Sequence, residues 1–465
     1  MGQLVLRVAN LLLGVAVTVF LVRGLGDQGF GQWSTLLAVT TLAGFLGDLG
    51  LSRVAVERAA AQPAQQAVWV GSLITLRLAL ALPTAAGAAM VCLLLADGAD
   101  MRVAGVLLCA ILLFAGLSSA RVIFQLQVRN TINTAIEIGN GIAWGAVVIV
   151  AVLVGEDGLV TLAAGFAIVG VITECTYFLV ARRAAPIAIR GSRKRWGQLL
   201  RLGIPVGVGG LLVLGYGYID QVLVFRISGA QDAGYYGAVY RIFDRVQFLP
   251  AVLMTTLFPI IVAARHADPA RVRRLFHMAI DYLVMASLPA LTITLAGPEA
   301  LVRLAFGAEF APAAPALPVL MATFLVVSLG YLSGYLILAY ELQRRFIVFA
   351  LAALVFNVSA NLLLLPSYGF MAAAWITLAT EILVVGLALH AVCRRMEIRP
   401  TGRHLDRIVI AAVAAGLVGW LLRQGGVPTG VWAALACAIY PAFLVGLRVV
   451  DLGELRALRR REDPV

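Results

Sequence analysis

The sequence predicts an all-α polytopic membrane protein with about fourteen transmembrane helices. Of its 465 residues, 62% are hydrophobic and only 13% are charged, and the mean hydropathy is +0.96. A soluble domain is about 45–50% apolar and about 25% charged. Apolar runs such as 103–114 and 347–365 recur through the whole length, so the composition excludes a globular protein with a single membrane anchor.

Glycine, proline and charged breaks divide the apolar runs into helices. A helix needs about 20 apolar residues to cross a bilayer, and this length sets the division. The expected transmembrane segments are 4–23, 31–52, 68–95, 102–123, 134–154, 159–181, 199–225, 234–262, 275–296, 312–340, 346–365, 370–392, 406–423 and 429–448.

Arginine is concentrated in alternate loops. The loops after the even-numbered helices carry at least two arginines each, whereas the loops between them carry one or none. Basic residues mark the cytoplasmic side of a membrane protein. We therefore expect the even-numbered loops and both termini to be cytoplasmic, in a bacterial cytoplasmic (inner) membrane. This distribution explains the net charge of +12 by topology and by attraction to anionic membrane lipid, without nucleic acid as a partner.

Residue patterns of enzymes and metal sites are missing from the sequence. It contains no H-E-x-x-H and no G-x-x-x-x-G-K-[ST]. The cysteines lie in or at the ends of apolar segments without a C-x-x-C pair, which is typical of packing residues. We expect no catalytic residue, no metal site, no bound cofactor and no enzymatic activity. The cysteines are Cys92, Cys109, Cys175, Cys393 and Cys437.

The end of the first helix resembles the end of the seventh. Arg23 is followed three residues later by a glycine and then by Gly29-Phe30-Gly31, and Arg226 is followed by Gly229 and then by 234–237, Gly-Tyr-Tyr-Gly. This spacing indicates a duplicated six-helix unit, and two such units insert with the same orientation because six is even. The expected parts are two lobes (1–181 and 199–395), a basic cytoplasmic linker (182–198), two additional helices (405–450) and a basic cytoplasmic tail (451–465).

These breaks carry a family resemblance. Together with Gly47-Asp-Leu-Gly-Leu51 and the run from Leu202 through Asp220 to Gly237, they are similar to the polysaccharide transport family over about residues 1–395. This family comprises the oligosaccharide-lipid flippases of the multidrug/oligosaccharidyl-lipid/polysaccharide exporter superfamily. The resemblance implies two lobes around a central cavity.

The resemblance also implies a transport function. Members move an undecaprenyl-diphosphate-linked oligosaccharide from the cytoplasmic to the outer leaflet by alternating access. The products are cell-surface polysaccharides such as lipopolysaccharide O-antigen or exopolysaccharide. The implied partners are the lipid-linked oligosaccharide and, in the same pathway, a polysaccharide polymerase.

Three arginines lie inside expected transmembrane segments, namely Arg77, Arg241 and Arg245. A charge at this depth is costly unless it is paired or hydrated, and a diphosphate headgroup requires cations inside the membrane. These residues either face a shared substrate cavity or form structural ion pairs between helices. Arg23, at the end of the first helix, is either an interfacial anchor or a fourth cavity residue.

Intramembrane carboxylates are candidates for coupling transport to H⁺ or Na⁺. Asp220 and Asp244 are the main candidates, and pairing with the nearby arginines is the alternative. Glu137 and Glu174 are further candidates, although both lie near helix ends where a side chain can extend to the membrane surface.

Two other function classes compete with a flippase. A multidrug cation antiporter of the same superfamily is the first alternative, and the cationic balance inside the membrane disfavours it. A membrane polymerase of the same pathway is the second, but its long extracytoplasmic catalytic loop has no counterpart here, since the longest such loop spans 297–311. The identity of the sugar leaves no trace in the sequence.

Overall fold

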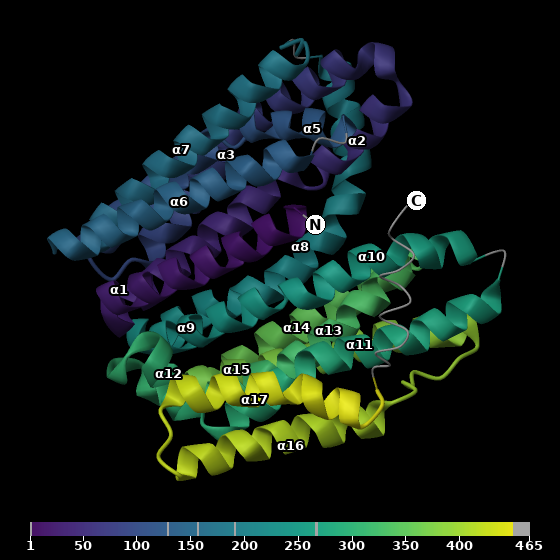
Figure 1. Cartoon of the computed structure of the whole chain (residues 1–465). Helices are drawn as coiled ribbons and strands as arrows, with labels where there is room; N and C mark the ends of the chain where they lie inside the picture. The colour runs from purple at the N-terminus through teal and green to yellow at the C-terminus, as the bar shows by residue number, and fades with distance from the viewer. Residues whose placement is uncertain (1, 128–129, 156–157, 190–191, 266–267, 450–465) are drawn as a thin grey trace. The chain divides into compact units, whose positions relative to one another are not determined.

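The computed structural model describes residues 2–127, 130–155, 158–189, 192–265 and 268–449, with side chains from residue 13 onward except at Asn130. Within these ranges every regular element is a helix, which confirms the expected all-α class (Figure 1). The expected tail 451–465 lies outside the described residues.

Twelve helices of the described chain are long and apolar enough to cross a membrane, or thirteen if a bent pair counts as one span. The first candidate, Leu13–Ala61, has 49 residues, more than twice the length that one crossing requires. Its helix α1 (Gly2–Asp48) is interrupted at Gly26, where φ is 65° and ψ is −176°. This stretch therefore holds two helices, and with the bent pair counted as one span the total is the expected fourteen.

Two compact units make up the chain: Met1–Ala238 with Ala350–Ala373, and Val239–Phe349 with Ala374–Val465. The two lobes expected from the repeat remain a prediction. Between residues 2 and 228 every described element is a helix, and η marks a 3₁₀ helix. The elements are α1 (Gly2–Asp48), α2 (Leu51–Ala61), η1 (Pro63–Gln65), α3 (Gln66–Leu95), α4 (Ala99–Ala110), η2 (Ile111–Leu113), η3 (Leu117–Arg121), α5 (Val122–Leu126), α6 (Asn130–Val154), α7 (Leu159–Ala184) and α8 (Arg193–Ser228).

The remaining elements are again all helical. They are α9 (Ala230–Val246), α10 (Phe248–Ala264), α11 (Pro269–Ala296), α12 (Pro298–Phe306), η4 (Ala308–Ala313), α13 (Ala316–Ala339), α14 (Gln343–Tyr368), α15 (Phe370–Met396), α16 (Leu405–Gln424) and α17 (Thr429–Gly446).

In the first unit, α1 packs against α3, α6 and α8, and α7 packs against α4 and α6. Aromatic rings fill one contact: Trp33 and Trp144 stack with centroids 5.6 Å apart, and Phe166 meets both rings edge-on. A second core, around Leu73 and Phe124, joins α3 to α5. Burial of such side chains fixes the rotation of each helix and thus the direction of its polar residues.

In the second unit, α11 packs against α13 and α16, and α17 packs against α16 (Figure 1). The two additional C-terminal helices expected from the sequence are α16 and α17. They are held by polar contacts as well as by packing, since the Tyr440 hydroxyl donates to the Met285 carbonyl (3.0 Å) and Arg423 donates to the Ala296 carbonyl (2.9 Å).

Two expected helices are broken. The segment 102–123 is a bent pair, Ala99–Leu113 and Leu117–Leu126, with an angle of 42° between the parts. The segment 234–262 is divided into α9 and α10 at Gln247. Pro250 explains the second break, because proline donates no backbone hydrogen bond and its ring clashes with the carbonyl four residues earlier.

Candidate functional site

Arg77 lies inside the first unit with two polar partners. It follows Gln66, the first residue of α3, by eleven residues, about 17 Å along the helix. Its side chain is 8% exposed. Its Nη1 atom is 3.5 Å from Asp48 Oδ1 and donates a hydrogen bond of 2.8 Å to Ser119 Oγ. A charge-compensated arginine is therefore built into the middle of a membrane-spanning helix.

A second carboxylate belongs to the same region. Glu174 on α7 accepts a hydrogen bond of 3.1 Å from the Ser118 backbone N–H. Arg77 interacts electrostatically with Asp48, Arg121 and Glu174. We call these four residues with Ser118 and Ser119 the Arg77 cluster. Its two arginines and two carboxylates balance each other, so the ion pairing that the sequence left as an alternative for Arg77 is present.

Asp220 is the centre of a second polar group, within the first unit. Its side chain is fully buried. Asn361 Nδ2 on α14 donates to Asp220 Oδ1 (2.8 Å), and the Tyr236 hydroxyl donates to Oδ2 (3.3 Å). Asn361 Nδ2 also lies 2.9 Å from the carbonyl oxygen of Asn357. We call these four residues the Asp220 network.

One atom of the Asp220 network has no hydrogen-bond partner. The side-chain oxygen of Asn361 is buried and accepts no hydrogen bond in the described part of the chain. A buried acceptor without a donor is costly, by about 1–3 kcal/mol. A carboxylate beside a free amide oxygen is chemically suited to hold a proton or a small hard cation such as Na⁺.

The charged residues at the C-terminal end of α9 are not balanced. Arg241 Nη1 is 3.9 Å from Asp244 Oδ2, a long ion pair between partly exposed side chains. Arg245 is half-buried and forms no ion pair within the described residues. The other carboxylate of α9, Asp232, lies in the first turn and accepts a hydrogen bond from the Phe370 N–H, so two arginines and one carboxylate leave an excess positive charge at the C-terminal end.

Two other candidates lie at exposed positions. Arg23 is exposed and precedes the α1 break at Gly26 by three residues. Glu137 is exposed on α6. The structure thus brings Arg77 and Glu174 into one cluster and Arg241 beside Asp244. The pairing of Asp220 with Arg241 stays a prediction.

The two glycine breaks that suggested a duplication share an unusual conformation. Gly229 has φ 95° and ψ 176°, close to the values at Gly26. The segments after the breaks pack backbone to backbone, because a Cβ on Gly31 would collide with the Ala230 carbonyl and one on Gly234 would collide with the Asp27 carbonyl. The two contacts are reciprocal, because the glycine in contact follows the glycine of the break at the same distance in sequence: Gly31 after Gly26, and Gly234 after Gly229.

Side chains reinforce this contact. The Asp27 carboxylate accepts hydrogen bonds from Gln231 Nε2 (2.6 Å) and from the Tyr235 hydroxyl (3.1 Å). The contact is called the glycine contact below and comprises 27–31 and 230–235.

Comparison with known families identifies the chain. A family model described as "Polysaccharide biosynthesis protein" matches residues 3–264, more than half of the sequence. The chain belongs to this family. No match was found among the curated proteins.

Solved structures resemble this chain in fold. The inward closed conformation of the lipid II flippase MurJ has a TM-score of 0.76 at 12% identity, covering 96% of this chain and 98% of MurJ. An inward-facing multidrug resistance MATE family transporter of the MOP superfamily has a TM-score of 0.62 at 14% identity, covering 83% and 94%.

A third similar structure is a MOP superfamily transporter from Pyrococcus furiosus described by the reverse polarity of its binding pocket. Its TM-score is 0.56 at 14% identity, with 84% of this chain and 94% of that chain covered. At these identities the likeness concerns the fold, which is that of MurJ-like and MATE-like transporters. The expected class and family are confirmed.

The sequence does not reveal which residues are the partners of the predicted site residues. Asp48 belongs to the quoted Gly-Asp-Leu-Gly motif, but nothing marked it as the counter-charge of Arg77. Asn357 and Asn361 lie four residues apart in an apolar helix and so share one face. That pattern of polar side chains in a membrane-spanning segment was the available signal for the Asp220 network.

Proposed function

We propose that this protein is a flippase that moves an undecaprenyl-diphosphate-linked oligosaccharide from the cytoplasmic to the outer leaflet by alternating access. The family supports a role in polysaccharide biosynthesis, and the fold supports transport. The product is a cell-surface polysaccharide, with O-antigen, other lipopolysaccharide and exopolysaccharide as the classes that fit. A polysaccharide polymerase of the same pathway would act on the exported substrate.

The excess positive charge at the C-terminal end of α9 carries this proposal. Arg245 lies fifteen residues into the 35-residue apolar stretch Ala230–Ala264, near its middle. An arginine without an ion pair at this depth is costly unless an anion compensates it. A diphosphate supplies that anion and matches the fork of guanidinium donors. Arg241 and Arg245 are therefore the proposed headgroup ligands, with Arg77 and Arg23 as further cationic positions.

We assign coupling to Asp220. Its burial and the unsatisfied oxygen of Asn361 suit a bound proton or Na⁺. The affinity of Asp220 for this proton or Na⁺ would differ between two conformations of the transporter. Binding of the cation would then shift the population toward the conformation that binds it more tightly. Asp244, Glu137 and Glu174 are weaker candidates, since Asp244 has an arginine partner, Glu137 is exposed and Glu174 already accepts a backbone hydrogen bond.

The proposed location follows the arginine distribution. Loops rich in arginine and both termini lie in the cytoplasm of a bacterium, and the protein spans the inner membrane. With this orientation the substrate enters from the leaflet in which lipid-linked oligosaccharides are assembled.

Arg245→Gln tests the proposal in bacteria whose only copy is the tested gene. We expect surface polysaccharide to fall by about tenfold or more, the effect of losing one charged hydrogen-bonding group worth about 1.5–3 kcal/mol. Lipid-linked oligosaccharide should accumulate in the cytoplasmic leaflet. Arg273→Gln, an exposed arginine at the start of α11, is the matched control and should export normally. Unchanged export by Arg245→Gln at equal protein level would refute the headgroup role.

Multidrug efflux is the alternative function, because MATE transporters share the fold. An uncompensated cation inside the membrane repels organic cations, which argues against it. Export of a cationic dye by the same cells, with normal polysaccharide in its absence, would reverse the proposal.

A further inference from the structure

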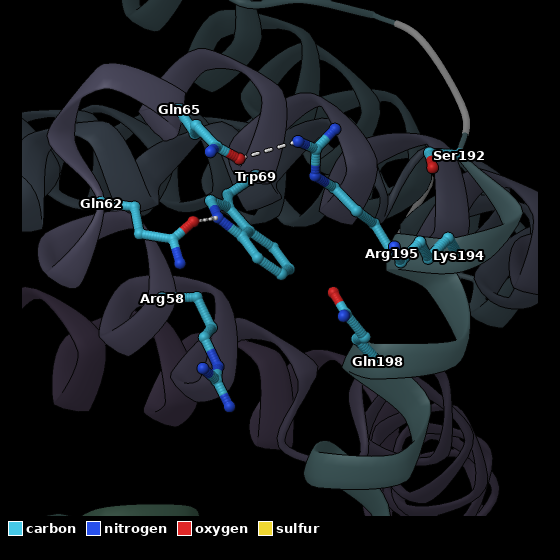
Figure 2. A pocket seen from close by; sticks show the side chains of 8 residues that line it. All are labelled: Arg58, Gln62, Gln65, Trp69, Ser192, Lys194, Arg195 and Gln198. Carbon is cyan, nitrogen blue, oxygen red and sulfur yellow. Dashed lines mark hydrogen bonds between the residues drawn. The ribbon is translucent and has the colours of Figure 1, made fainter.

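A cationic cavity of about 460 Å³ opens in the first unit, where the end of α2 meets the starts of α3 and α8 (Figure 2). Arg58, Lys194 and Arg195 line it, and no acidic side chain is among its described lining residues. Glu57, which neighbours Arg58 in sequence, pairs instead with Arg53 at 3.5 Å. The cavity therefore has a net positive charge and favours an anionic ligand.

The polar groups of this cavity are held in place. Trp69 is buried, and its Nε1 atom donates to Gln62 Oε1 (3.1 Å). The Arg195 guanidinium carbon lies 5.5 Å from the centre of the Trp69 ring, and Arg195 donates to Gln65 Oε1 (2.9 Å), as Figure 2 shows. Because these side chains are already ordered, a ligand would find a preformed site.

The walls of the cavity come from segments more than one hundred residues apart. Trp196 Nε1 on α8 donates to Thr75 Oγ1 on α3 (3.2 Å). The Ala188 N–H donates to the Ala67 carbonyl (3.1 Å), and Gly71 lies so close to the Ala188 carbonyl that a Cβ would collide with it. These contacts attach the expected linker region to α3 and keep the cavity assembled.

The cavity lies at the ends of two membrane-spanning stretches. Pro63–Leu95 and Arg193–Ser228 both begin beside it. This end of the helices is the one that the arginine distribution predicts to be cytoplasmic. Tryptophan combined with basic residues is typical of the interface between lipid and water, where headgroup phosphates are the abundant anions.

We propose that this cavity binds the phosphate of an anionic phospholipid headgroup in the adjacent leaflet. Arg58, Lys194 and Arg195 donate to the phosphate oxygens, and Trp69 packs against the glycerol portion. The volume lies within the range of small-molecule sites, about 300–1,000 Å³. The inference is independent of the transported substrate, since it requires only the fold of the first unit.

Native mass spectrometry of the full chain, transferred from nanodiscs of phosphatidylcholine with increasing phosphatidylglycerol, tests the site. We expect Arg58→Gln/Arg195→Gln to weaken phosphatidylglycerol binding by about tenfold, as expected for two charged hydrogen-bonding groups at a surface site. Arg182→Gln/Arg183→Gln removes the same charge from exposed positions at the end of α7 and should change binding less than about twofold. Lys194→Gln, at an exposed position, is a third variant that spares the contacts of Trp69.

Several results would overturn the proposal. If Arg58→Gln/Arg195→Gln and Arg182→Gln/Arg183→Gln weaken phosphatidylglycerol binding equally, the lipid is attracted by the surface charge in general. If binding is unchanged in both Lys194→Gln and Arg58→Gln/Arg195→Gln, the cavity is not a lipid site. Binding of inorganic phosphate at millimolar concentration without preference for phosphatidylglycerol would identify a free-anion site instead. Equal melting temperatures of all variants are the required control for folding.

Discussion

Arg77 and Asp48 form an ion pair, and removal of either partner leaves the other charge uncompensated. Arg77→Met leaves Asp48 without its counter-charge inside the membrane, and breaking a buried ion pair costs about 3–5 kcal/mol. We expect each single variant, Arg77→Met and Asp48→Leu, to lower the free energy of unfolding by about 3 kcal/mol. The double variant should recover most of this loss, because no charge is left unpaired. Unfolding in detergent, followed by circular dichroism, measures all three.

Transport by the double variant shows whether Arg77 only stabilises the fold or also binds the substrate. If Arg77 contributes to substrate binding, the stable double variant still fails to export polysaccharide. Normal export by the double variant would restrict Arg77 to the ion pair.

Asp220→Asn is predicted to uncouple transport from an ion gradient. The amide keeps the shape of the side chain but removes the negative charge that would attract H⁺ or Na⁺ to the Asp220 network. Transport into vesicles should then proceed at the same rate with and without an imposed gradient. Asp232→Asn is the matched control, because Asp232 caps α15 through the Phe370 N–H (3.0 Å) and lies outside the network. A gradient response that survives in Asp220→Asn would contradict the assignment.

At this scale the sequence identifies charged residues but not their partners. Arg77, Arg241 and Arg245 can be recognised from the sequence, because a charged side chain is costly inside an apolar membrane-spanning segment and is therefore rare there. Pairing of Arg77 with Ser119 depends on how α3 rotates against η3, which is set by packing between segments forty residues apart. That rotation is not encoded in local composition, and so Asp48 and Ser119 appeared only in the structure.

At the scale of elements, the glycine contact is the feature most sensitive to small changes. Gly31→Ala and Gly234→Ala would each place a methyl group against a backbone carbonyl that cannot rotate away. We expect each to destabilise the protein by about 1–3 kcal/mol, the usual cost of overpacking. Gly87→Ala on α3 is the control, because no atom lies within 4 Å of the added carbon and the change should be neutral or stabilising by up to about 1 kcal/mol.

Melting temperatures in detergent compare these variants. Equal melting of Gly31→Ala, Gly234→Ala and Gly87→Ala would show that the close approach is not maintained in the membrane protein.

The elements were predictable where a local signal ends a helix. Gly26 and Gly229 were recognised as breaks, and both have positive φ, a conformation that glycine adopts without strain. The bend at 114–116 was missed, because its sequence is continuously apolar and hydropathy does not register a bend. The segment 234–262 was expected as one helix, whereas α9 ends at Val246 and α10 begins at Phe248.

For the whole molecule, composition was sufficient to predict the class and the approximate helix count. Water is absent from the bilayer core, so each spanning segment must satisfy its own backbone, and helices do so. The division into compact units was less accessible: Ala350–Ala373 joins Met1–Ala238, a grouping that depends on contacts between segments far apart in sequence.

The proposed substrate of the molecule is a lipid that carries phosphate. Purified protein in vesicles can be offered three fluorescent probes: a polyprenyl-diphosphate-linked oligosaccharide, the same oligosaccharide on a neutral polyprenyl ether, and a cationic dye. Movement between leaflets or into the lumen is followed with a membrane-impermeant quencher. We predict that only the diphosphate probe moves faster than in protein-free vesicles, and that Arg245→Gln slows it. Faster movement of the dye without any movement of the diphosphate probe would contradict this prediction.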